Sequence, residues 1–552
     1  MSWLTRSKSW SASKYLQRVC GKILDLGILQ CRMRCQLRCA IVNMRIGIDV
    51  GGTNTDGVLM QGREVLAWAK KATSADVTSG IKDVLQSLLG TNVQPKDIGA
   101  VMIGTTHFTN AVIQRRDLVP TGVVRLCLPA GEAVPPLYDW PRDLQAVVGN
   151  HRHLAHGGHE FDGREISPLD ADELARIADK LTDAGVNALA IVGVFAPVTP
   201  EHEQRASEIF RARNPQVEIA LSHEIGRLSL LERENATALN ASLAPLARRT
   251  MRGFRNALAE MDIQAELYVT QNDGTLMSAD FAEQYPVLTF SSGPTNSMRG
   301  AAFLTGLSDA MVIDIGGTTT DVGVLSGGFP REASFAVDIG GVRTNFRMPD
   351  LISIGLGGGS LVREEGHRIG PDSVGYQIRE RSLAFGGDEL TATDIAVASG
   401  WVELGDPERV ANLPEETRSQ AQTTIHDLIA QAVDQLRTSP DPVPVIVVGG
   451  GSILVHGDLD GASEVHKPEH FLVANAIGAA IAQVSGEVDQ IFSLETMSRQ
   501  AAIGAARDQA HARTIQAGAL PDTIEVVELE EIPLPYLPSS AIRIRVKMVG
   551  QL

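Results

Sequence analysis

The chain has 552 residues, of which 43% are hydrophobic, and a formal net charge of −17, so it is long enough to bury the cores of two or more domains. Its acidic body argues against nucleic-acid binding, and no run of about 18 apolar residues predicts a membrane span. Only Cys127 lies beyond residue 43, so disulfides do not hold the body together and we expect a reducing, cytoplasmic location.

The first 43 residues differ from the rest. They hold eight Lys or Arg against one Asp, and four of the five cysteines: Cys20, Cys31, Cys35 and Cys39. A basic, Ser-containing segment with so little acid is typical of a transit peptide. We favour an upstream extension, disordered or not native, because "MRIGIDVGG" from Met44 opens like a natural first strand. No His or Cys group in the sequence completes a four-ligand metal set with Cys35 and Cys39.

Short apolar runs alternate with helical patterns along the first half, which predicts an α/β fold. Strands are expected at residues 44–50, 65–72, 100–106 and 187–197, and helices at 77–90 and 170–185. The stretch 129–170 is rich in loop formers, so an inserted subdomain is expected over about residues 130–190.

In the second half, apolar residues recur at helical spacing from Ile225 to Met261, and Pro245 leaves open two helices or one kinked helix. Strands are expected at 265–274 and 443–452, the latter followed by a small-residue helix from Val473. Residues 522–550 alternate apolar and polar positions on either side of a Pro-containing turn, which predicts a terminal pair of strands.

One phrase occurs twice: "DVGGTNTDG" from Asp49 and "DIGGTTTDVG" from Asp314, each after an apolar strand. Two adjacent glycines let the backbone approach an anion, which N–H groups and Thr hydroxyls can then bind. An Asp at the end of each strand can hold Mg2+, directly or through water, or orient an attacking group. One such turn could be a plain hairpin connection, but two copies with matching flanks predict two phosphate hairpins.

Two facing phosphate hairpins resemble the actin, Hsp70 and sugar kinase superfamily, in which two lobes clamp a nucleotide. Its other marks follow in order: connecting helices resemble "SGPTNSMRGAAFLTG" from Ser292 and "ANAIGAAIA" from Ala474, and the adenosine turn resembles "VIVVGGGS". The resemblance implies a two-lobed α/β fold of the actin-like ATPase (ribonuclease H-like) type with the nucleotide cleft between lobes. We therefore expect a first lobe over 44–305, a second over 306–520 and a small C-terminal β segment over 521–552.

Within this superfamily the chain is more similar to the hydantoinase A and 5-oxoprolinase group. The phrases that carry this likeness are "IGTTHFTNAVIQRR" from Ile103, "SSGPTNSMRGA" from Ser291 and "IGLGGGSLV" from Ile354. The likeness covers the chain from Met44 on, in the short form without the long C-terminal region. The chain departs from the group at "GPDSVGYQIRERSLAFGGDELTATD", which lacks the longer "GPxSxGAxPGPxCY" phrase and its Cys, so the resemblance does not identify the substrate.

The resemblance implies an ATP-dependent amidohydrolase component that phosphorylates the amide oxygen of a cyclic amide, such as a hydantoin, 5-oxoproline or a lactam, and so activates the ring for opening. It also implies ATP and Mg2+ as cofactors and a hydantoinase B-type or other partner that completes hydrolysis. Two alternatives stay open: a small-molecule kinase of the same fold, and a non-enzymatic actin-like or Hsp70-like ATP switch. No GxGxxG opens a helix after the first strand, which argues against a Rossmann oxidoreductase.

The predicted site combines both hairpins. Asp49 and Asp314 are expected to hold Mg2+ and to act in catalysis, while Asp56 and Asp321 brace their hairpins. Residues 357–360 could be a flexible loop, but three glycines between apolar strands favour a further backbone cradle. Phosphate and nucleoside binding is expected from Gly51, Gly52, Thr53, Asn54, Gly316, Gly317, Thr318, Thr319, Gly357, Gly358, Gly359, Ser360, Gly449, Gly450 and Gly451.

Substrate-side candidates come from "GTTHFTN", namely Thr105, Thr106, His107 and Asn110, with His107 for proton transfer. The two threonines could equally be polar caps at a helix start.

Two other polar stretches are given structural interpretations. The His-rich "HRHLAHGGHE" from His151 suggests zinc, but a Gly-rich segment without fixed register favours a solvated loop. Glu232, Arg233 and Glu234 are expected to form a charged helix face.

Overall fold

The structure is a computed structural model that describes residues 44–52, 54–72, 77–90, 93–226, 228–333, 337–346, 348–495, 497–534 and 541–552. The predictions for residues 1–43, including their four cysteines, and for Thr53 lie outside the described residues.

The largest sheet has nine strands in the order β22-β23-β21-β10-β9-β4-β1-β2-β3. Their bounds are β1 Met44–Val50, β2 Asn54–Gln61, β3 Glu64–Ala72, β4 Ile98–Thr105, β9 Glu266–Thr270, β10 Leu276–Ser278, β21 Val484–Ser493, β22 Glu525–Leu534 and β23 Ala541–Gly550. The strands predicted at 44–50, 65–72, 100–106 and 265–274 are confirmed, as is the helix expected at 77–90, which is α2 (Val77–Leu89).

The second sheet repeats the central pattern of the first. Its order is β13-β12-β11-β19-β20, with β16 also paired to β12. In the first sheet, β1 pairs antiparallel with β2 and parallel with β4. In the second sheet, β11 pairs in the same way with β12 and β19. The bounds are β11 Ala310–Ile315, β12 Thr320–Ser326, β13 Phe329–Pro330, β16 Leu351–Ile354, β19 Val443–Val448 and β20 Ala462–His466.

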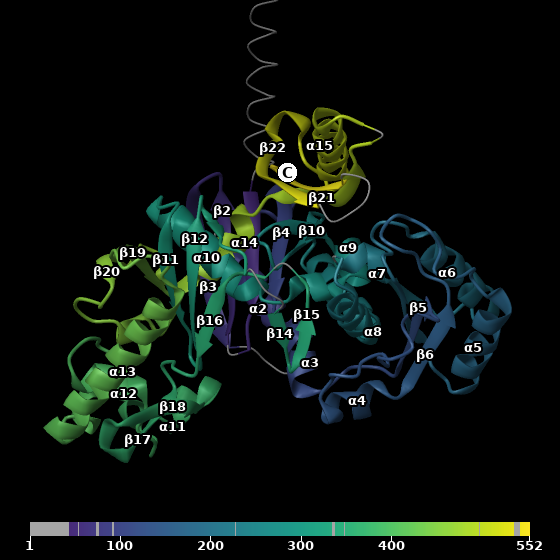
Figure 1. The fold of residues 1–552 in the computed structure, drawn as a ribbon. Helices are drawn as coiled ribbons and strands as arrows, with labels where there is room; N and C mark the ends of the chain where they lie inside the picture. Colours follow the sequence, from purple (N-terminus) through teal and green to yellow (C-terminus); the bar gives the residue numbers. More distant parts are fainter. Residues whose placement is uncertain are drawn as a thin grey trace, which may run out of the picture.

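Helices α12 (Ala392–Ala398) and α13 (Glu415–Leu436) pack on this second sheet through one apolar core that includes Ile313, Val447 and Ile425. A separate hairpin, β17 (Ser360–Arg363) with β18 (Arg368–Ser373), lies below them in Figure 1, and α11 (Ile378–Arg381) follows it in the chain.

A third sheet forms an inserted unit, at the right of Figure 1, in which all strands are parallel in the order β6-β5-β7-β8. The unit contains β5 Thr121–Leu128, α4 Arg142–Val148, β6 His151–His156, α5 Ala171–Asp183, β7 Ala188–Gly193, α6 Glu201–Arg213, β8 Glu218–Leu221 and α7 Ser222–Ile225. The helix predicted at 170–185 is confirmed as α5, and the strand predicted at 187–197 is confirmed over the residues of β7.

The His-rich stretch of this unit is not the solvated loop that we expected. Residues His151–His156 form β6, and His159 is only 3% exposed. The ring of His159 packs on that of His202, with centroids 4.2 Å apart. Nδ1 of His202 accepts from the Gly158 N–H at 3.0 Å, so in the neutral ring Nε2 carries the proton, and it lies 3.3 Å from a carboxylate oxygen of Glu165.

The helical pattern between Ile225 and Met261 forms one long helix, α8 (Leu230–Glu260), which runs through Pro245 and is not divided into two helices there. This helix is central to the first lobe, because Leu239, Leu243 and Phe254 on it belong to the main apolar core.

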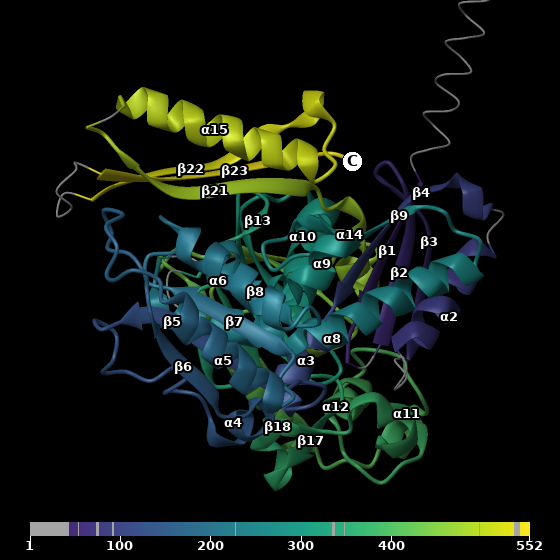
Figure 2. The same ribbon diagram turned by 90° about the vertical axis from the view of Figure 1, so that its right-hand side faces the viewer.

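The terminal strand pair is confirmed, since β22 and β23 run antiparallel. Strand β21 pairs with both β23 and β10, so these strands extend the first sheet. Figure 2 shows α15 (Arg499–Gln516) lying along them. The lobe boundaries stay a prediction. Strand β21 and helix α15 fall within residues 306–520, the range expected for the second lobe, yet β21 is hydrogen-bonded to the first sheet.

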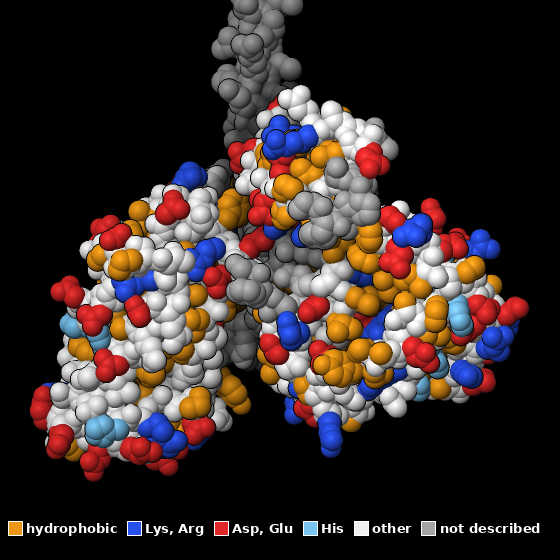
Figure 3. All heavy atoms as spheres, in the orientation of Figure 1, with side chains coloured by type: hydrophobic (Ala, Val, Ile, Leu, Met, Phe, Trp, Pro, Cys, Tyr) orange, Lys and Arg blue, Asp and Glu red, His pale blue; other side chains and the backbone are white. Residues whose placement is uncertain are grey.

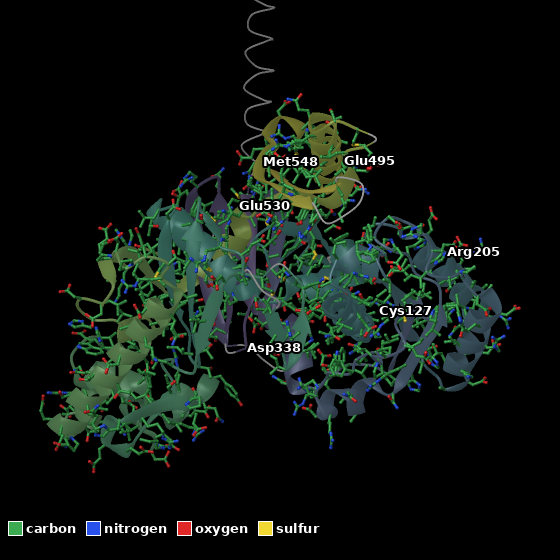
Figure 4. The ribbon with its side chains drawn as sticks, viewed as in Figure 1. Cys127, Arg205, Asp338, Glu495, Glu530 and Met548 are labelled. Atoms are coloured by element: carbon green, nitrogen blue, oxygen red, sulfur yellow. The ribbon has the colours of Figure 1, made fainter. Side chains whose placement is uncertain are left out.

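One hairpin links the lobes. Strands β14 (Val337–Ile339) and β15 (Val342–Thr344) follow the second sheet's hairpin in sequence, yet Ile339 and Val342 are buried in the core of the first lobe. Asp338, labelled in Figure 4, marks this hairpin between the lobes. Its tip is held by Arg115, which donates to the Gly340 carbonyl at 2.8 Å.

On the face shown in Figure 3, acidic and basic side chains are intermixed, with no broad basic patch. None of the described helices combines the length and the apolar character that a membrane crossing requires.

Candidate functional site

The two copies of the repeated phrase fold in the same way. Asp49 pairs with Asp56 in the first hairpin, and Asp314 pairs with Asp321 in the second. Each turn is closed by the first glycine: the Gly51 N–H donates to the Asn54 carbonyl at 3.0 Å, and the Gly316 N–H donates to the Thr319 carbonyl at 2.9 Å. The sequence repeat is therefore a structural repeat.

Both hairpins border one cleft of about 260 Å³. It is lined by Gly51, Gly52, Asn54, Asp56, Lys70, Ser297, Asp314, Gly316, Gly317, Thr318, Thr319, Gly449, Gly450, Phe471, Leu472, Ala474 and Asn475. The structure thus brings together most of the predicted phosphate-binding residues and the predicted nucleoside turn. Asp49, Gly451, residues 357–360, Thr106 and His107 are not among the lining residues.

Two closely packed helices contribute further residues to the lining of this cleft. Helix α10 (Ser292–Thr305) and α14 (Ala474–Ile481) approach so closely that a β-carbon on Gly478 would lie 1.8 Å from the Asn296 carbonyl oxygen. Only glycine fits there. This crossing brings Asn296 of α10 and Asn475 of α14 to the same carboxylate, that of Asp49.

Asp49 lies behind the cleft surface. It is 5% exposed, and its two oxygens accept from the amides of Asn296 at 3.3 Å and Asn475 at 3.0 Å. Burial and the neighbouring charge of Asp56 raise the pKa of Asp49 to about 6. These contacts suit a positioning role for Asp49, and its expected binding of Mg2+, directly or through water, stays a prediction.

Asp314 lines the cleft from the second hairpin. Oδ2 accepts from the Ser297 hydroxyl at 2.5 Å, and burial raises the pKa of Asp314 above its usual range. Its partner Asp321 lies outside the cleft lining, and burial together with the charge of Asp314 raises the pKa of Asp321 to about 6.

Asp56, expected only to brace its hairpin, faces the cleft and forms an ion pair with Lys70 of β3, both of its oxygens lying 2.7 Å from Nζ. Lys70 is not among the site residues predicted from the sequence. A signal was present, because β2 and β3 are adjacent strands and Asp56 is the direct cross-strand partner of Lys70.

The Gly-rich residues 357–360 do not form the expected backbone cradle. The N–H groups of Gly358 and Gly359 donate to the carbonyls of Gly316 and Gly317, at 3.0 and 2.8 Å, and the Gly357 N–H donates to the Ser360 hydroxyl at 2.8 Å. These donors are consumed within the protein and are not free for a phosphate. The segment instead supports the second hairpin from behind.

The substrate-side candidates lie beside the first hairpin. The Thr106 N–H and hydroxyl lie 3.3 and 3.4 Å from the Val50 carbonyl, and α3 (His107–Gln114) starts directly after them. Asn110 donates to the Thr106 hydroxyl at 3.3 Å, and Thr105 is fully buried. Burial lowers the pKa of half-buried His107. Roles for Thr106 and His107 in catalysis stay predictions.

The expected charged helix face at the start of α8 is wrong for two of its three residues. Arg233 and Glu234 are 0% and 1% exposed. Glu234 binds the guanidinium of buried Arg125 through two contacts of 2.7 Å. Glu232 alone is partly exposed.

The cleft fits a nucleotide with a divalent cation. Backbone turns of two hairpins and threonine hydroxyls can bind phosphates. Burial, with the charge of Asp56 as a smaller cause, raises the pKa of Asp49 and of Asp314, and a bound cation would favour the ionised form of both carboxyl groups.

The chain matches the sequence models of two protein-family regions: "Hydantoinase/oxoprolinase N-terminal region" over residues 45–213 and "Hydantoinase/oxoprolinase" over residues 233–435. Caprolactamase subunit alpha of Pseudomonas jessenii is 26% identical over 496 residues, which cover 83% of this chain and 69% of that protein. The acetophenone carboxylase gamma subunit of Aromatoleum aromaticum is 26% identical over 427 residues, covering 70% of this chain but only 57% of that protein.

Among solved structures, the ATP-dependent caprolactamase from Pseudomonas jessenii superposes with a TM-score of 0.73 at 20% identity, covering 92% of this chain and 88% of that one. This likeness concerns the fold, and it confirms the predicted two-lobed α/β architecture.

Proposed function

The chain belongs to the hydantoinase/oxoprolinase family, and on that basis we propose that it uses ATP to phosphorylate the amide oxygen of a cyclic amide, so that the ring can be opened by hydrolysis. An unstrained lactam or imide resists water, whereas phosphorylation of the amide oxygen makes the ring carbon electrophilic. Water adds to that carbon, the C–N bond breaks as the nitrogen takes up a proton, and hydrolysis of the resulting acyl phosphate releases the carboxylate and phosphate.

The observation that carries this proposal is the pair of equivalent hairpins around one cleft, with Asp314 at its surface. Phosphoryl transfer depends mainly on positioning and on neutralising charge. In the cleft lining, the first hairpin offers the Gly52 N–H and the Asn54 amide, and the second offers the Gly317 N–H and the hydroxyls of Thr318 and Thr319, so donors flank a polyphosphate from both sides.

Within this proposal, Asp314 holds Mg2+ or its water shell, and Asn54, Thr318 and Thr319 bind phosphate oxygens. The bound cation would neutralise phosphate charge. Lys70 adds a positive charge opposite Asp314, and Asp49 keeps Asn475 in place. Gly449 and Gly450 let the backbone pass beside the nucleoside.

The substrate is proposed to be a hydantoin, 5-oxoproline or a lactam. A hydantoinase B-type or other partner is proposed for the hydrolytic step, supported by the relative from Pseudomonas jessenii, which is itself described as a subunit. The cytoplasmic location expected from the sequence stays a prediction.

A second candidate acceptor is a ketone, because one relative is a subunit of acetophenone carboxylase. The same cleft would then phosphorylate the oxygen of an enolate in place of an amide. The nucleotide chemistry is shared, and only the acceptor differs.

The test measures ADP release by the full chain against hydantoin, 5-oxoproline, lactams of several ring sizes and acetophenone, with and without a candidate partner subunit. Substrate-stimulated ADP release that couples to ring opening when the partner is added supports the proposal. A stable phosphorylated product favours the kinase alternative, and stimulation by acetophenone alone favours the ketone. ADP release that no small acceptor stimulates contradicts the proposal.

A further inference from the structure

A second cavity, of about 310 Å³, lies at the carboxyl edge of the four-stranded parallel sheet. Residues from the segments after β7 and β8 form one wall, and residues of β21 and α15 form the other; those used below are Pro197, Val198, His223, Asp489, Ile491 and Arg513. In open parallel sheets, ligands bind beyond the carboxyl ends of the strands. None of these residues lines the nucleotide cleft.

His223 is held in one orientation by a buried carboxylate. Glu203 is 0% exposed, and one of its oxygens lies 2.6 Å from Nδ1 of His223. Glu203 also accepts from the Gly193 N–H at 2.6 Å, the Ser222 hydroxyl at 2.5 Å and the His223 N–H at 3.1 Å. Because both Glu203 oxygens already accept from other N–H or O–H groups, Nδ1 of His223 is the donor in this contact, and in the neutral ring Nε2 is then an acceptor.

A buried arginine completes this network. Arg233 is 0% exposed and donates to the Gly193 carbonyl at 2.6 Å and to the Ser222 hydroxyl at 2.9 Å. Burying a carboxylate and a guanidinium is costly unless both are fully hydrogen-bonded. Of these groups, Glu203 contacts His223 directly, and Arg233 holds Gly193 and Ser222, which donate to Glu203.

The opposite wall supplies a cation. Arg513 is exposed on α15, one guanidinium nitrogen donates to the Glu487 carbonyl, and no carboxylate among the described residues pairs with it. Asp489 on the same wall is already paired with Arg543, at 2.7 and 2.6 Å. The side chains of Pro197, Val198 and Ile491 add apolar surface.

We propose that this cavity binds a small acid that carries both a carboxylate and an N–H group. The carboxylate accepts from Arg513, the N–H donates to Nε2 of His223, and the carbon chain packs against the apolar residues. The assignment does not rest on the function proposed above, although the ring-opened product of a cyclic amide belongs to this class.

The test is calorimetric titration of the full chain, without nucleotide, with four probes. 6-Aminohexanoate carries the two groups at opposite ends of a carbon chain, 5-oxoproline carries both on one carbon, hexanoate lacks the N–H group and caprolactam lacks the carboxylate. 6-Aminohexanoate should bind with one site per chain, and the other three about tenfold more weakly or worse. Arg513→Gln and His223→Gln should weaken binding by about tenfold, while Arg507→Gln, exposed on the same helix outside the cavity, should leave it unchanged.

The affinity of His223→Gln is compared with that of the wild type only if the two melting curves match. Arg513 is exposed, so Arg513→Gln is expected to fold and tests the proposal even if His223→Gln does not. Absence of binding by all four probes overturns the proposal, as does equal affinity of wild type and Arg513→Gln. Binding that is lost in Asp314→Ala but kept in Arg513→Gln would assign the ligand to the nucleotide cleft, which also overturns it.

Discussion

A β-carbon on Gly449 would lie 2.3 Å from Oδ1 of Asp314, the carboxylate at the end of the second hairpin. Gly449 also has a φ of +86°, a conformation that residues with a β-carbon rarely adopt. The predicted nucleoside turn is therefore packed directly against the predicted metal ligand. Both constraints act on one residue, which makes the turn specific for glycine.

Gly449→Ala should lower the free energy of unfolding by about 1–3 kcal/mol, because it adds backbone strain and displaces Asp314. Gly450→Ala is the matched control, since its β-carbon would meet nothing within 4 Å. Urea denaturation of both variants measures the difference. Equal stability of the two variants would contradict the packing described here.

Asp314→Ala should reduce substrate-stimulated ADP release at least about 100-fold, since it removes the carboxylate proposed to bind the cation. Asp427→Asn, exposed on α13 of the same lobe, is the control and should retain activity. Steady-state kinetics with a saturating acceptor distinguishes them. Retained turnover in Asp314→Ala would refute the metal assignment.

Lys70→Met should weaken ATP binding about tenfold, because it removes a charged donor from the cleft and leaves Asp56 without its ion pair. Lys71→Met is the matched control, since Lys71 is exposed on the same strand and is not a lining residue. Fluorescent nucleotide titration measures both affinities. Indistinguishable affinities would remove Lys70 from the site.

The parts of the site that sequence reasoning found are local in the chain. A strand, two glycines and a Thr-Asp return form a hairpin from neighbouring residues alone, so Asp314 and its turn could be predicted. The prediction of a phosphate cradle at residues 357–360 was wrong for a physical reason. A run of glycines also lets one backbone segment pack on another, and here its N–H groups donate to the carbonyls of Gly316 and Gly317. Composition does not separate these two uses of glycine.

The missed features depend on contacts between distant residues. Glu234 looked like one more charge on a helix because its partner, Arg125, is 109 residues away. Strand β6 was missed because His, Arg and Gly dominate its neighbourhood, and of its residues Ala155 belongs to the apolar core of the unit, beside Val124 and Leu126 of β5. Predicting either feature would require knowing which distant residues lie next to each other in the folded protein.

Glu234→Gln should destabilise the protein by about 3–5 kcal/mol, because it leaves Arg125 as an unpaired buried charge. Glu232→Gln, two residues earlier on α8 and partly exposed, should change stability by less than about 0.5 kcal/mol. Thermal and urea unfolding of both variants provide the measurement. A small effect at both positions would restore the charged-face interpretation of this helix start.

The last prediction concerns pH and Asp321, whose pKa burial and the nearby charge of Asp314 raise to about 6. The ordinary value of 3.8 applies to the unfolded chain, so between these values the folded protein binds the extra proton. The stabilising contribution is therefore complete below about pH 4 and is lost as pH rises through about 6.

Asp321→Asn mimics the protonated carboxyl and lies outside the nucleotide cleft. It should be about as stable as the wild type near pH 4 and more stable at about pH 7.5, by up to about 3 kcal/mol. Urea denaturation across this range, without nucleotide or metal, measures the difference. Asp427→Asn should follow the wild-type curve, and an Asp321→Asn curve parallel to the wild type would show that Asp321 is already ionised at the lower pH.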